Sequence, residues 1–447
     1  MALTAAQKEI VSQRVLSWYD SNARELPWRL PPRSYPPSCN ATQQAQAYQV
    51  LVSELMLQQT QVKRVKPRFE AWLNRWPSLS DLALSASEDD VTRAWAGLGY
   101  YNRAKNLLKI CQTIHSHHAG NLPSTRVKLQ SLKGIGSYTA SAISSIAFGE
   151  PVGAVDANVV RVLSRLCNLH LTKEAGFEQY QQIADELAFA ASSRASDWNP
   201  ALMDLGATVC TPKAPKCSEC PLKAHCAAYN DDSVCVEDLP PKQAKPERRL
   251  VQRRSRVLRA RIHGTAADSP EKKYVLLCKR PCGVSLLAGL WEFPSSDDGT
   301  SADIDALLKH EGIQYDLPEK QSCGRIQDAG EVSHTFSHIQ QQTQVEVQDA
   351  LIHSPSNVDV ESGKRIEEAQ WIPESDIPKF GLSSGPMKVW KQAQLILNSD
   401  SGRHRQVIKK RSRSNKSSAS SRNINEYFSS HSAADKTAKK CRLDDDD

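Results

Sequence analysis

Apolar residues recur at helical spacing through the first half of the chain. A first stripe near the N-terminus consists of Val11, Val15, Trp18 and Tyr19. Residues 50–57 follow as a nearly continuous apolar helix, and similar patterns continue to about residue 230 with only short loops between them. We therefore expect an all-α domain over residues 1–230. Residues 30–47 interrupt the pattern with four prolines, which predicts a surface insertion.

The period of the pattern changes after residues 231–249, where acidic residues and prolines predict an interdomain linker. Apolar and basic residues then alternate over residues 258–262, as they do in a β-strand. The apolar run at residues 274–278 and the alternating Val345 and Val347 also predict strands. The second domain, residues 250–396, is therefore expected to have an α+β fold.

Composition narrows the class of protein further. A chain of 447 residues has room for two or three domains, and its net charge of +7 is unevenly distributed. Residues 403–442 contain twelve Lys and Arg against two acidic residues. Because residues 397–447 contain few apolar side chains to bury, they are expected to form a disordered basic tail. Such a tail either attracts polyanions or only keeps the protein soluble.

Cysteine usage indicates both a compartment and a metal centre. Twelve cysteines without a signal peptide or an apolar run of membrane length indicate a reducing compartment and no membrane partner. Four of them follow a C-x6-C-x2-C-x5-C pattern: Cys210, Cys217, Cys220 and Cys226. Zinc ribbons use two C-x2-C pairs, so this spacing favours an iron–sulfur cluster over zinc or chance clustering. The run resembles the cluster loop of the endonuclease III and MutY DNA glycosylases, which implies a [4Fe-4S] cofactor.

Residues 125–149 predict a helix, a short turn and a second helix. Gly134 and Gly136 in the turn would let the backbone approach a phosphate closely. The N-terminus of the following helix presents free N–H groups to such an anion. A plain helical corner would give the same pattern. Beside the cysteine run, however, the segment resembles the helix-hairpin-helix DNA-binding motif of the same glycosylase superfamily.

The residue two positions after Gly136 indicates the reaction class. Members of this superfamily that also cut the DNA strand carry a lysine there, whose amine attacks the sugar and forms a Schiff base. This chain has Tyr138, and a phenol cannot form an imine. The resemblance therefore implies a monofunctional glycosylase, which removes a base with water. Lys133 lies before the turn and is expected to contact a phosphate.

Two carboxylates in the helical region have contrasting surroundings. Glu54 lies in an otherwise apolar helix, where desolvation should raise its pKa and let it hold a proton near neutral pH. Asp156 precedes a helix that it could N-cap, so it should stay ionised. Cleavage of an N-glycosidic bond needs one proton donor and one fixed anion. A hydrogen-bonded buried glutamate and a purely structural cap remain the simpler alternatives.

Four segments resemble MutY-type adenine DNA glycosylases and occur in the order found in that family. They are Leu26–Arg29, Val52–Thr60, Gly97–Tyr101 and Val155–Val159. The likeness covers about residues 10–230. It implies a helix-hairpin-helix glycosylase fold and a role in base excision repair. The implied substrate is double-stranded DNA that contains adenine opposite 8-oxoguanine or guanine.

The same resemblance assigns roles at the reacting base and sugar. It implies that Glu54 protonates the adenine and that Asp156 supports the cationic sugar. Tyr138 and Asn158 match residues that assist at the sugar.

Further matches fall on residues that hold the base or the DNA. Trp28 and Arg29 match part of the base pocket. Gln59 and Tyr100 match residues that enter the base stack beside the lesion, as stabilising a flipped-out nucleotide requires. Tyr101 is an alternative to Tyr100 as the residue that enters the base stack.

The second domain resembles Nudix-type domains at Leu287–Pro294. A working Nudix hydrolase needs a glutamate-rich helix to hold Mg²⁺, but the corresponding residues 305–312 lack such ligands. The domain is therefore expected to recognise rather than to catalyse. Phe336, Ser337 and His338 resemble the family loop that reaches the 8-oxoguanine, with a structural hairpin as the alternative.

The tail adds expectations on partners and location. Ile424, Tyr427 and Phe428 have the spacing of one apolar helical turn and resemble the motif that docks on the replicative sliding clamp. Ser421 stands where that motif usually has glutamine, and stray apolar residues are the alternative. The basic runs at residues 409–413 and 439–440 are either nuclear-import signals or non-specific DNA contacts. We expect a nuclear protein and leave a mitochondrial pool open.

These observations together predict a monomeric nuclear enzyme that excises adenine mispaired with 8-oxoguanine. Two other functions compete with this prediction. The first is a bifunctional glycosylase and lyase that acts on oxidised pyrimidines. The second is a lesion-binding scaffold without catalysis.

Overall fold

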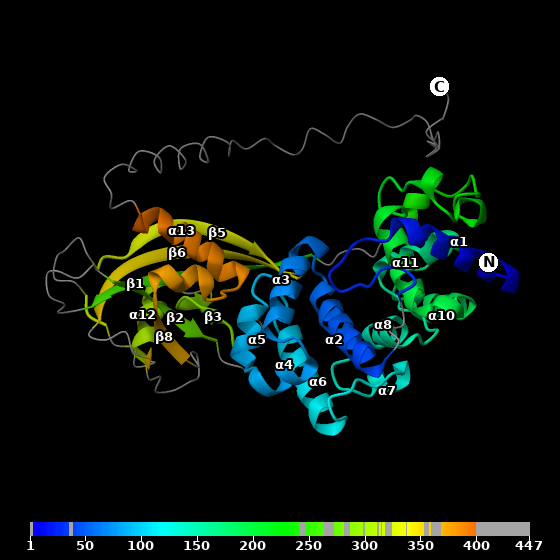
Figure 1. Cartoon of the computed structure of the whole chain (residues 1–447). Helices are drawn as coiled ribbons and strands as arrows, with labels where there is room; N and C mark the ends of the chain where they lie inside the picture. The colour runs from blue at the N-terminus through cyan, green and yellow to red at the C-terminus, as the bar shows by residue number, and fades with distance from the viewer. Residues whose placement is uncertain are drawn as a thin grey trace, which may run out of the picture. The chain divides into compact units, whose positions relative to one another are not determined.

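The chain folds into two compact units, of which the first contains Met1–Lys245 and the second starts at Pro246. Figure 1 labels the elements of each unit. The computed structural model describes residues 3–34, 39–241, 247–262, 272–280, 287–297, 300–310, 313, 315–317, 324–336, 338–352, 357–358 and 368–398. Ser337 and the tail residues Ile424, Tyr427 and Phe428 lie outside the described residues.

The first unit is helical, as the spacing of its apolar residues predicts. Its α-helices are α1 (Ala5–Asn22), α2 (Asn40–Leu57), α3 (Val62–Arg75), α4 (Leu79–Ser85), α5 (Glu88–Ala94), α6 (Asn102–His117), α7 (Arg126–Gln130), α8 (Ser137–Phe148), α9 (Ala157–Leu166), α10 (Phe177–Ala190) and α11 (Ala195–Thr208). Short 3₁₀ helices are η1 (Ser192–Arg194), η2 (Cys217–Glu219), η3 (Lys223–His225) and η4 (Val236–Asp238). Thr4, Ser78 and Ser87 cap helix starts with capping boxes. No helix in the described part of the chain has the length and hydrophobicity of a membrane span.

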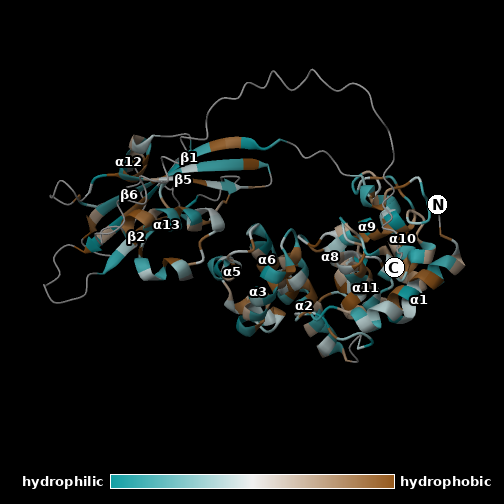
Figure 2. Ribbon diagram, turned by 90° about the horizontal axis from the view of Figure 1, so that it is seen from above, coloured by the Kyte–Doolittle hydropathy of each residue, from teal (hydrophilic) through white to brown (hydrophobic). Residues whose placement is uncertain are grey.

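Helix α8 packs against both α2 and α11 in the core of this unit. Figure 2 shows hydrophobic residues distributed along these helices. Leu51 of α2 and Ile143 of α8 are fully buried, and small residues such as Ala140 allow the helices to approach closely. Because α2 carries Glu54 and α8 carries Tyr138, this packing brings two polar side chains together inside an apolar core.

The predicted surface insertion at residues 30–47 extends too far, because α2 already starts at Asn40. Gln46 is buried and donates through Nε2 to Trp28 O at 3.0 Å. Ala47 next to it has no accessible surface. The run of glutamines concealed this helix in the sequence, since its polar side chains are used for tertiary hydrogen bonds.

The second unit is a mixed β-sheet with α-helices against it. Its strands are β1 (Arg249–Ile262), β2 (Lys273–Lys279), β3 (Trp291–Glu292), β4 (Ser295–Asp297), β5 (Gln327–Thr335), β6 (Ile339–Ile352), β7 (Asn357–Val358) and β8 (Glu368–Pro373). The helices are α12 (Ser301–His310), η5 (Glu374–Lys379) and α13 (Ser384–Leu397). The strand order is β5-β6-β1-β2-β8-β7, with β3 beside β2 and β4 beside β1. Strands β1 and β6 run parallel, whereas β5 and β6 form an antiparallel hairpin.

The sheet has a hydrophobic core on each face. Trp390 of α13 packs in one core with Val257 and Val345. Ile304 of α12 packs in the other with Leu258, the next residue along β1. Successive residues of β1 therefore enter opposite cores, as the alternation of side chains along a strand requires.

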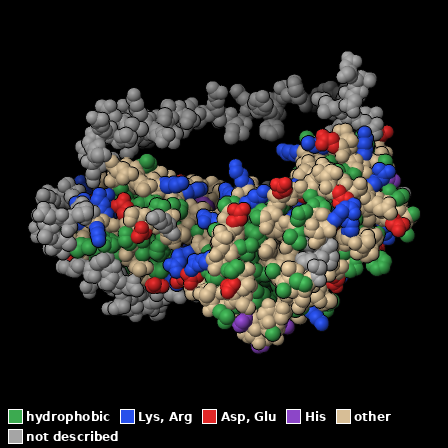
Figure 3. Space-filling model, viewed as in Figure 1, with side chains coloured by type: hydrophobic (Ala, Val, Ile, Leu, Met, Phe, Trp, Pro, Cys, Tyr) green, Lys and Arg blue, Asp and Glu red, His purple; other side chains and the backbone are tan. Residues whose placement is uncertain are grey.

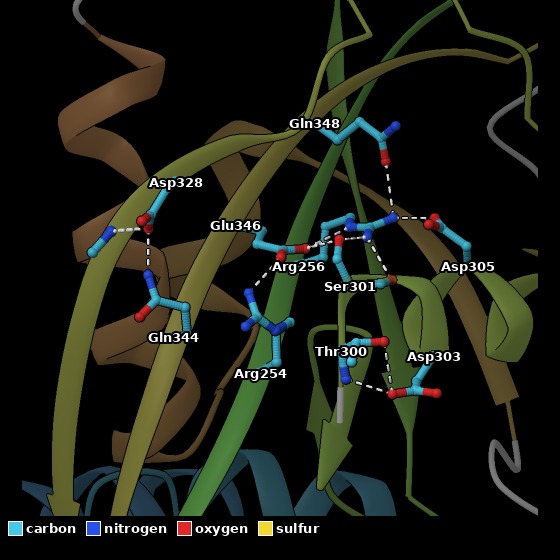
Figure 4. Close-up of polar contacts among 11 residues, drawn as sticks. Arg254, Arg256, Thr300, Ser301, Asp303, Asp305, Asp328, Gln344, Glu346 and Gln348 are labelled. Carbon is cyan, nitrogen blue, oxygen red and sulfur yellow. Dashed lines mark hydrogen bonds and ion pairs between the residues drawn. The ribbon is translucent and has the colours of Figure 1, made fainter. Parts of the chain in front are cut away.

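Arginines on β1 are buried as well, which the alternating sequence pattern alone does not predict. Arg259 is 2 % exposed, and its Nε lies 2.7 Å from Asp349 Oδ1. Figure 4 shows Arg256 among oxygen acceptors that include Glu346 of β6 and Asp305 of α12. Since both faces of the sheet are covered, these charges are neutralised by carboxylates instead of reaching water.

Part of the predicted linker at residues 231–249 packs on the first unit. Leu239 is buried, and its carbonyl oxygen accepts from Arg165 Nε at 3.0 Å. Glu237 Oε1 accepts from the backbone N–H of Ala214 at 2.9 Å. The prolines and charges of the segment predicted that it would be exposed to solvent. Instead, the buried side chain of Leu239 and the hydrogen bonds of Leu239 O and Glu237 hold it against the first unit.

Candidate active site and cysteine loop

Glu54 and Tyr138 form the centre of the candidate active site. Glu54 is 6 % exposed, and its Oε2 accepts a hydrogen bond of 2.6 Å from the Tyr138 hydroxyl. Burial raises the pKa of Glu54 to about 7, although the hydrogen bond from Tyr138 and the charge of Arg29 both favour its ionised form. The predicted rise in this pKa is confirmed, and the carboxyl group can therefore donate a proton near neutral pH.

Asp156 is the N-cap of α9, as predicted. Its Oδ1 accepts from Val159 N at 2.7 Å, and its Oδ2 accepts from Asn158 Nδ2 at 2.8 Å. Two hydrogen-bond donors thus hold the carboxylate in place at the start of α9. Its negative charge contributes to raising the pKa of Glu54, so the two carboxyl groups act on one another electrostatically.

Asn158 also connects the candidate active site to the cysteine loop. Its Oδ1 accepts from Arg161 Nη2 at 2.8 Å. Arg161 Nε in turn donates to Cys210 O at 2.7 Å. A continuous chain of hydrogen bonds therefore runs from the carboxylate of Asp156 to the backbone of the first cysteine.

Trp28 and Arg29, the predicted base-pocket residues, are largely enclosed by protein. Trp28 is buried, with its ring centroid 5.3 Å from that of Phe69 in an edge-to-face arrangement. Arg29 Nη1 lies 2.6 Å from Asp204 Oδ1. Arg29 and Glu54 influence one another electrostatically, and the charge of Arg29 favours the ionised form of Glu54.

The predicted helix, turn and helix are α7, residues 131–136 and α8. Gly134 has φ +99°, and a Cβ there would meet Ile110 Cδ1 at 3.2 Å, so the turn requires glycine at this position. A Cβ on Gly136 would meet nothing within 4 Å, which leaves open space directly before α8. No side chain caps α8, so the first turn remains available to an external anion.

Gln59 and Tyr100, the predicted base-stack residues, are both exposed. Tyr100 is 50 % exposed, whereas Tyr101 is buried and its hydroxyl accepts from Gly97 N at 3.4 Å. Of these two tyrosines, Tyr100 is therefore the one whose ring can reach a ligand. Figure 3 shows basic and acidic side chains interspersed over the visible face, so charge alone does not mark out a DNA-binding surface there.

The four predicted cysteine ligands line one small cavity after α11. Arg165 Nη1 lies 3.4 Å from Cys210 Sγ, and Lys216 and Lys223 also line the cavity. Burial raises the pKa of the Cys220 thiol to about 12 and that of the Cys226 thiol to about 11. Burial thus disfavours free thiolates at these two cysteines, and a bound cation would stabilise them.

The donor set fits an iron–sulfur cluster or another thiophilic metal. Four cysteines line the cavity together with Arg165, Lys216 and Lys223, and the lining contains no histidine. Among the described residues, no three Cys, His or acidic side chains already have the mutual positions of metal ligands.

In the second unit, Phe336 and His338 flank the tip of the β5–β6 hairpin. The Phe336 N–H donates to Ile339 O at 2.8 Å, which closes the turn. The ring of Phe336 lies edge-to-face against His334, with 4.6 Å between centroids. His338 is exposed, so it is available to a ligand.

Comparison with known proteins matches both units. Residues 52–189 match the HhH-GPD superfamily of base excision DNA repair proteins, and residues 269–392 match the NUDIX domain. The adenine DNA glycosylase of Schizosaccharomyces pombe is 32 % identical over 430 residues, which cover 87 % of this chain and 90 % of that protein. The chain belongs to the adenine DNA glycosylase family.

A second adenine DNA glycosylase and a solved structure of another glycosylase are also similar to this chain. The Mus musculus enzyme is 34 % identical, over 84 % of this chain and 76 % of that protein. A solved thermostable thymine-DNA glycosylase is 24 % identical over 51 % of this chain and 99 % of that chain, with a TM-score of 0.43. The resemblance inferred from the sequence is confirmed, and so is the expected order of a helical glycosylase unit and a Nudix unit.

Three residues that touch the candidate site were missed by the sequence analysis. Asp204 is fully buried and accepts from both Arg24 and Arg29, and Arg161 and Arg103 are buried donors. Asp204 could have been found from the sequence, since it interrupts an apolar helix as Glu54 does. The two arginines gave no such signal, because they lie on amphipathic helices where basic residues usually face solvent.

Proposed function

We propose that this adenine DNA glycosylase hydrolyses the N-glycosidic bond of adenine mispaired with 8-oxoguanine, and with guanine, without cutting the DNA strand. The observation that carries the proposal is Glu54, a buried carboxyl group with a pKa of about 7, hydrogen-bonded to Tyr138. A proton donor of this kind suits an adenine that must leave as a neutral base.

In the proposed reaction, Glu54 donates its proton to a ring nitrogen of the flipped-out adenine. The bond between the base and C1′ of the sugar then breaks, and its electron pair stays with the adenine. The fixed carboxylate of Asp156 stabilises the cationic sugar that remains. Water adds to C1′ and gives its extra proton to a carboxylate of the site, which completes hydrolysis and leaves the strand intact.

Tyr138 supports a monofunctional enzyme. Strand cutting by this superfamily needs an amine at that position, and the phenol instead donates to Glu54 at 2.6 Å. Lys133, which lies nearby in the sequence, is exposed on the hairpin turn and suits a phosphate contact.

For the cysteine loop, we propose that Cys210, Cys217, Cys220 and Cys226 hold a [4Fe-4S] cluster. When bound, the cluster would cross-link the loop and supply no proton or nucleophile. The loop's own lysines, Lys213 and Lys216, would then be fixed for contact with the DNA backbone. The cavity that the four cysteines line supports this assignment.

We further propose that the Nudix unit recognises the 8-oxoguanine through Phe336, Ser337 and His338. The exposed position of His338 beside the turn of the β5–β6 hairpin supports a role in binding. Asp305, the acidic residue of α12 closest to the sheet network, is paired with buried Arg256 rather than free for Mg²⁺ (Figure 4). Docking on the sliding clamp, a monomeric state and a nuclear location stay predictions from the sequence.

One experiment separates the proposed function from its two competitors. Purified protein is incubated with duplexes carrying adenine opposite 8-oxoguanine, guanine or thymine, and each product is divided between hot alkali and no treatment. Cleavage only after alkali, strongest opposite 8-oxoguanine, is expected. Cleavage without alkali would indicate the bifunctional lyase. Tight binding to the duplex with no release of adenine, even after long incubation with excess DNA, would indicate the scaffold.

A further inference from the structure

Two exposed residues of the first unit have left-handed backbones although neither is glycine. Gln59, just beyond the end of α2, has φ +54°, and Tyr100, just before α6, has φ +48°. Residues with a Cβ avoid this conformation, so the surrounding structure must hold both of them in place. Such held conformations occur at sites where a side chain must be presented in one direction.

Arg103 of α6 contacts the segment that contains Gln59. Its Nη1 lies 2.6 Å from Leu55 O, 3.1 Å from Met56 O and 2.6 Å from Gln58 O. These carbonyl groups belong to the C-terminal end of α2, where the last carbonyls lack helical partners and the dipole favours a cation. The same guanidinium thus completes the end of the helix that carries Glu54.

Arg103 also contacts the turn that contains Tyr100. Its Nη2 lies 2.9 Å from Gly99 O and 3.2 Å from Leu98 O, and its Nε lies 3.4 Å from Tyr100 O. The guanidinium carbon is 5.6 Å from the centroid of the Tyr100 ring. One side chain, only 8 % exposed, therefore joins both segments with left-handed residues.

We propose that Arg103 is a positioning residue that fixes Gln59 and Tyr100 together for entry into the base stack. The proposal rests on the proposed function for the role of these two residues at DNA. Arg103 itself is enclosed by backbone carbonyls and acts through the backbones that it holds. A planar guanidinium can bridge the two segments, whereas a lysine ammonium is a point donor that cannot span them.

The test compares Arg103→Lys in two backgrounds, the natural chain and Q59A/Y100A. Adenine release is measured in single turnover with excess enzyme on an adenine:8-oxoguanine duplex. In the natural chain, R103K should slow release by at least about tenfold, since small misplacements remote from the chemistry can cost up to about 10²-fold. In the Q59A/Y100A background, R103K should slow adenine release by less than about a further twofold. Such non-additivity is expected where one residue acts through the others. Equal losses in both backgrounds would overturn the proposal.

A second readout needs no base release. Fluorescence of 2-aminopurine placed opposite 8-oxoguanine reports unstacking, and Glu54→Gln as the parent keeps the duplex intact. R103K should remove most of the unstacking signal at saturating protein. An unchanged signal would overturn the proposal. If the natural chain unstacks the probe but releases no adenine, the proposed function fails while the role of Arg103 is still tested.

Two further variants separate positioning from loss of stability. Arg194→Lys alters another largely buried arginine, which is paired with Asp20 and Asp197 elsewhere in the unit. It should lower the unfolding temperature but keep the unstacking signal. Thr60→Val removes a hydroxyl that accepts from Arg103 Nη2 at 3.2 Å and donates to Leu98 O at 3.1 Å. It should weaken unstacking in the same direction as R103K, and it provides the test if R103K does not fold. If T60V kept the full unstacking signal while R194K lost it, the signal would follow general stability and not the contacts of Arg103. That result would contradict positioning by Arg103.

Discussion

The hydroxyl of Tyr138 lies 2.6 Å from Glu54 Oε2 and donates to it from the first turn of α8. This hydrogen bond favours the carboxylate, whereas burial favours the protonated acid and has the larger effect. The resulting pKa of about 7 leaves Glu54 divided between its two forms at neutral pH. In the proposed mechanism, this pair therefore sets the pH range in which Glu54 holds the proton that it donates.

Replacing Glu54 by Gln should abolish turnover while preserving DNA binding. The amide keeps the shape of the side chain but has no acidic proton, and general acid catalysis is typically worth roughly 10²–10⁴-fold. Single-turnover adenine release should therefore slow by at least that factor, with an unchanged dissociation constant for the duplex. Normal release by E54Q would remove Glu54 from the mechanism.

Glu54 should also make stability depend on pH in a defined direction. Its pKa is raised from 4.5 to about 7 on folding, so the folded protein binds this proton more tightly than the unfolded chain. The resulting stabilisation is fully present below pH 4.5 and is lost as the pH rises through 7. The free energy of unfolding should therefore decrease by about 3 kcal/mol across this range relative to E54Q.

Urea titrations of both proteins between pH 5.5 and 8.5 would measure most of this change. E54Q lacks the titrating group and serves as the reference at each pH. As the pH increases, the free energy of unfolding of the natural protein should decrease relative to that of E54Q. A difference that stays constant with pH would mean that Glu54 is not protonated in the folded protein.

Removing the Tyr138 hydroxyl should shift the pH dependence of adenine release. Since this donor lowers the pKa of Glu54, Tyr138→Phe should raise that pKa and move the alkaline decline in rate to higher pH. Tyr180→Phe is the control, because Tyr180 of α10 is a buried tyrosine whose hydroxyl donates to a backbone carbonyl, Leu171 O at 2.7 Å, instead of to a carboxyl group. If Y138F and Y180F had the same pH profile, the hydrogen bond would not tune the acid.

The residues predicted from the sequence were those whose chemistry conflicts with their local pattern. Glu54 stands out in an apolar helix, and Gly134 in a turn where only glycine fits. Arg103 and Arg259 looked like ordinary solvent-facing residues, because their partners are carbonyl and carboxylate groups far along the chain. Local pattern therefore predicted the helices, the strands and the buried carboxyl group of Glu54 with its raised pKa. It could not predict which long-range contacts bury a charge.

The proposed cluster should be lost when one predicted ligand in the cysteine loop is removed. Cys220→Ser leaves three thiols around the cavity, so the purified protein should contain less iron and sulfide and unfold at a lower temperature. Cys235→Ser is the control, because Cys235 does not line this cavity. Four irons per chain would agree with the proposed cluster. One zinc per chain, lost in C220S, would assign the loop to zinc instead.

Asp204 should stabilise the active site by neutralising buried cations. It has no accessible surface, and its Oδ1 lies 2.6 Å from Arg29 Nη1 and 2.7 Å from Arg24 Nη2. Asp204→Asn keeps the size of the side chain but leaves Arg29 enclosed without this counter-charge. Removing one partner of a buried pair costs about 3–5 kcal/mol, so the loss in unfolding free energy should be of that order.

A partly exposed ion pair provides the comparison for Asp204. Arg126 Nη1 lies 2.8 Å from Asp185 Oδ1, and both side chains remain about a quarter to a third exposed, at 26 % and 31 %. Asp185→Asn should therefore cost only about 1 kcal/mol or less, because water screens both charges. Urea unfolding at one pH measures both variants. Equal losses in D204N and D185N would mean that water reaches Arg29, and the site around Glu54 would then be wetter than its burial indicates.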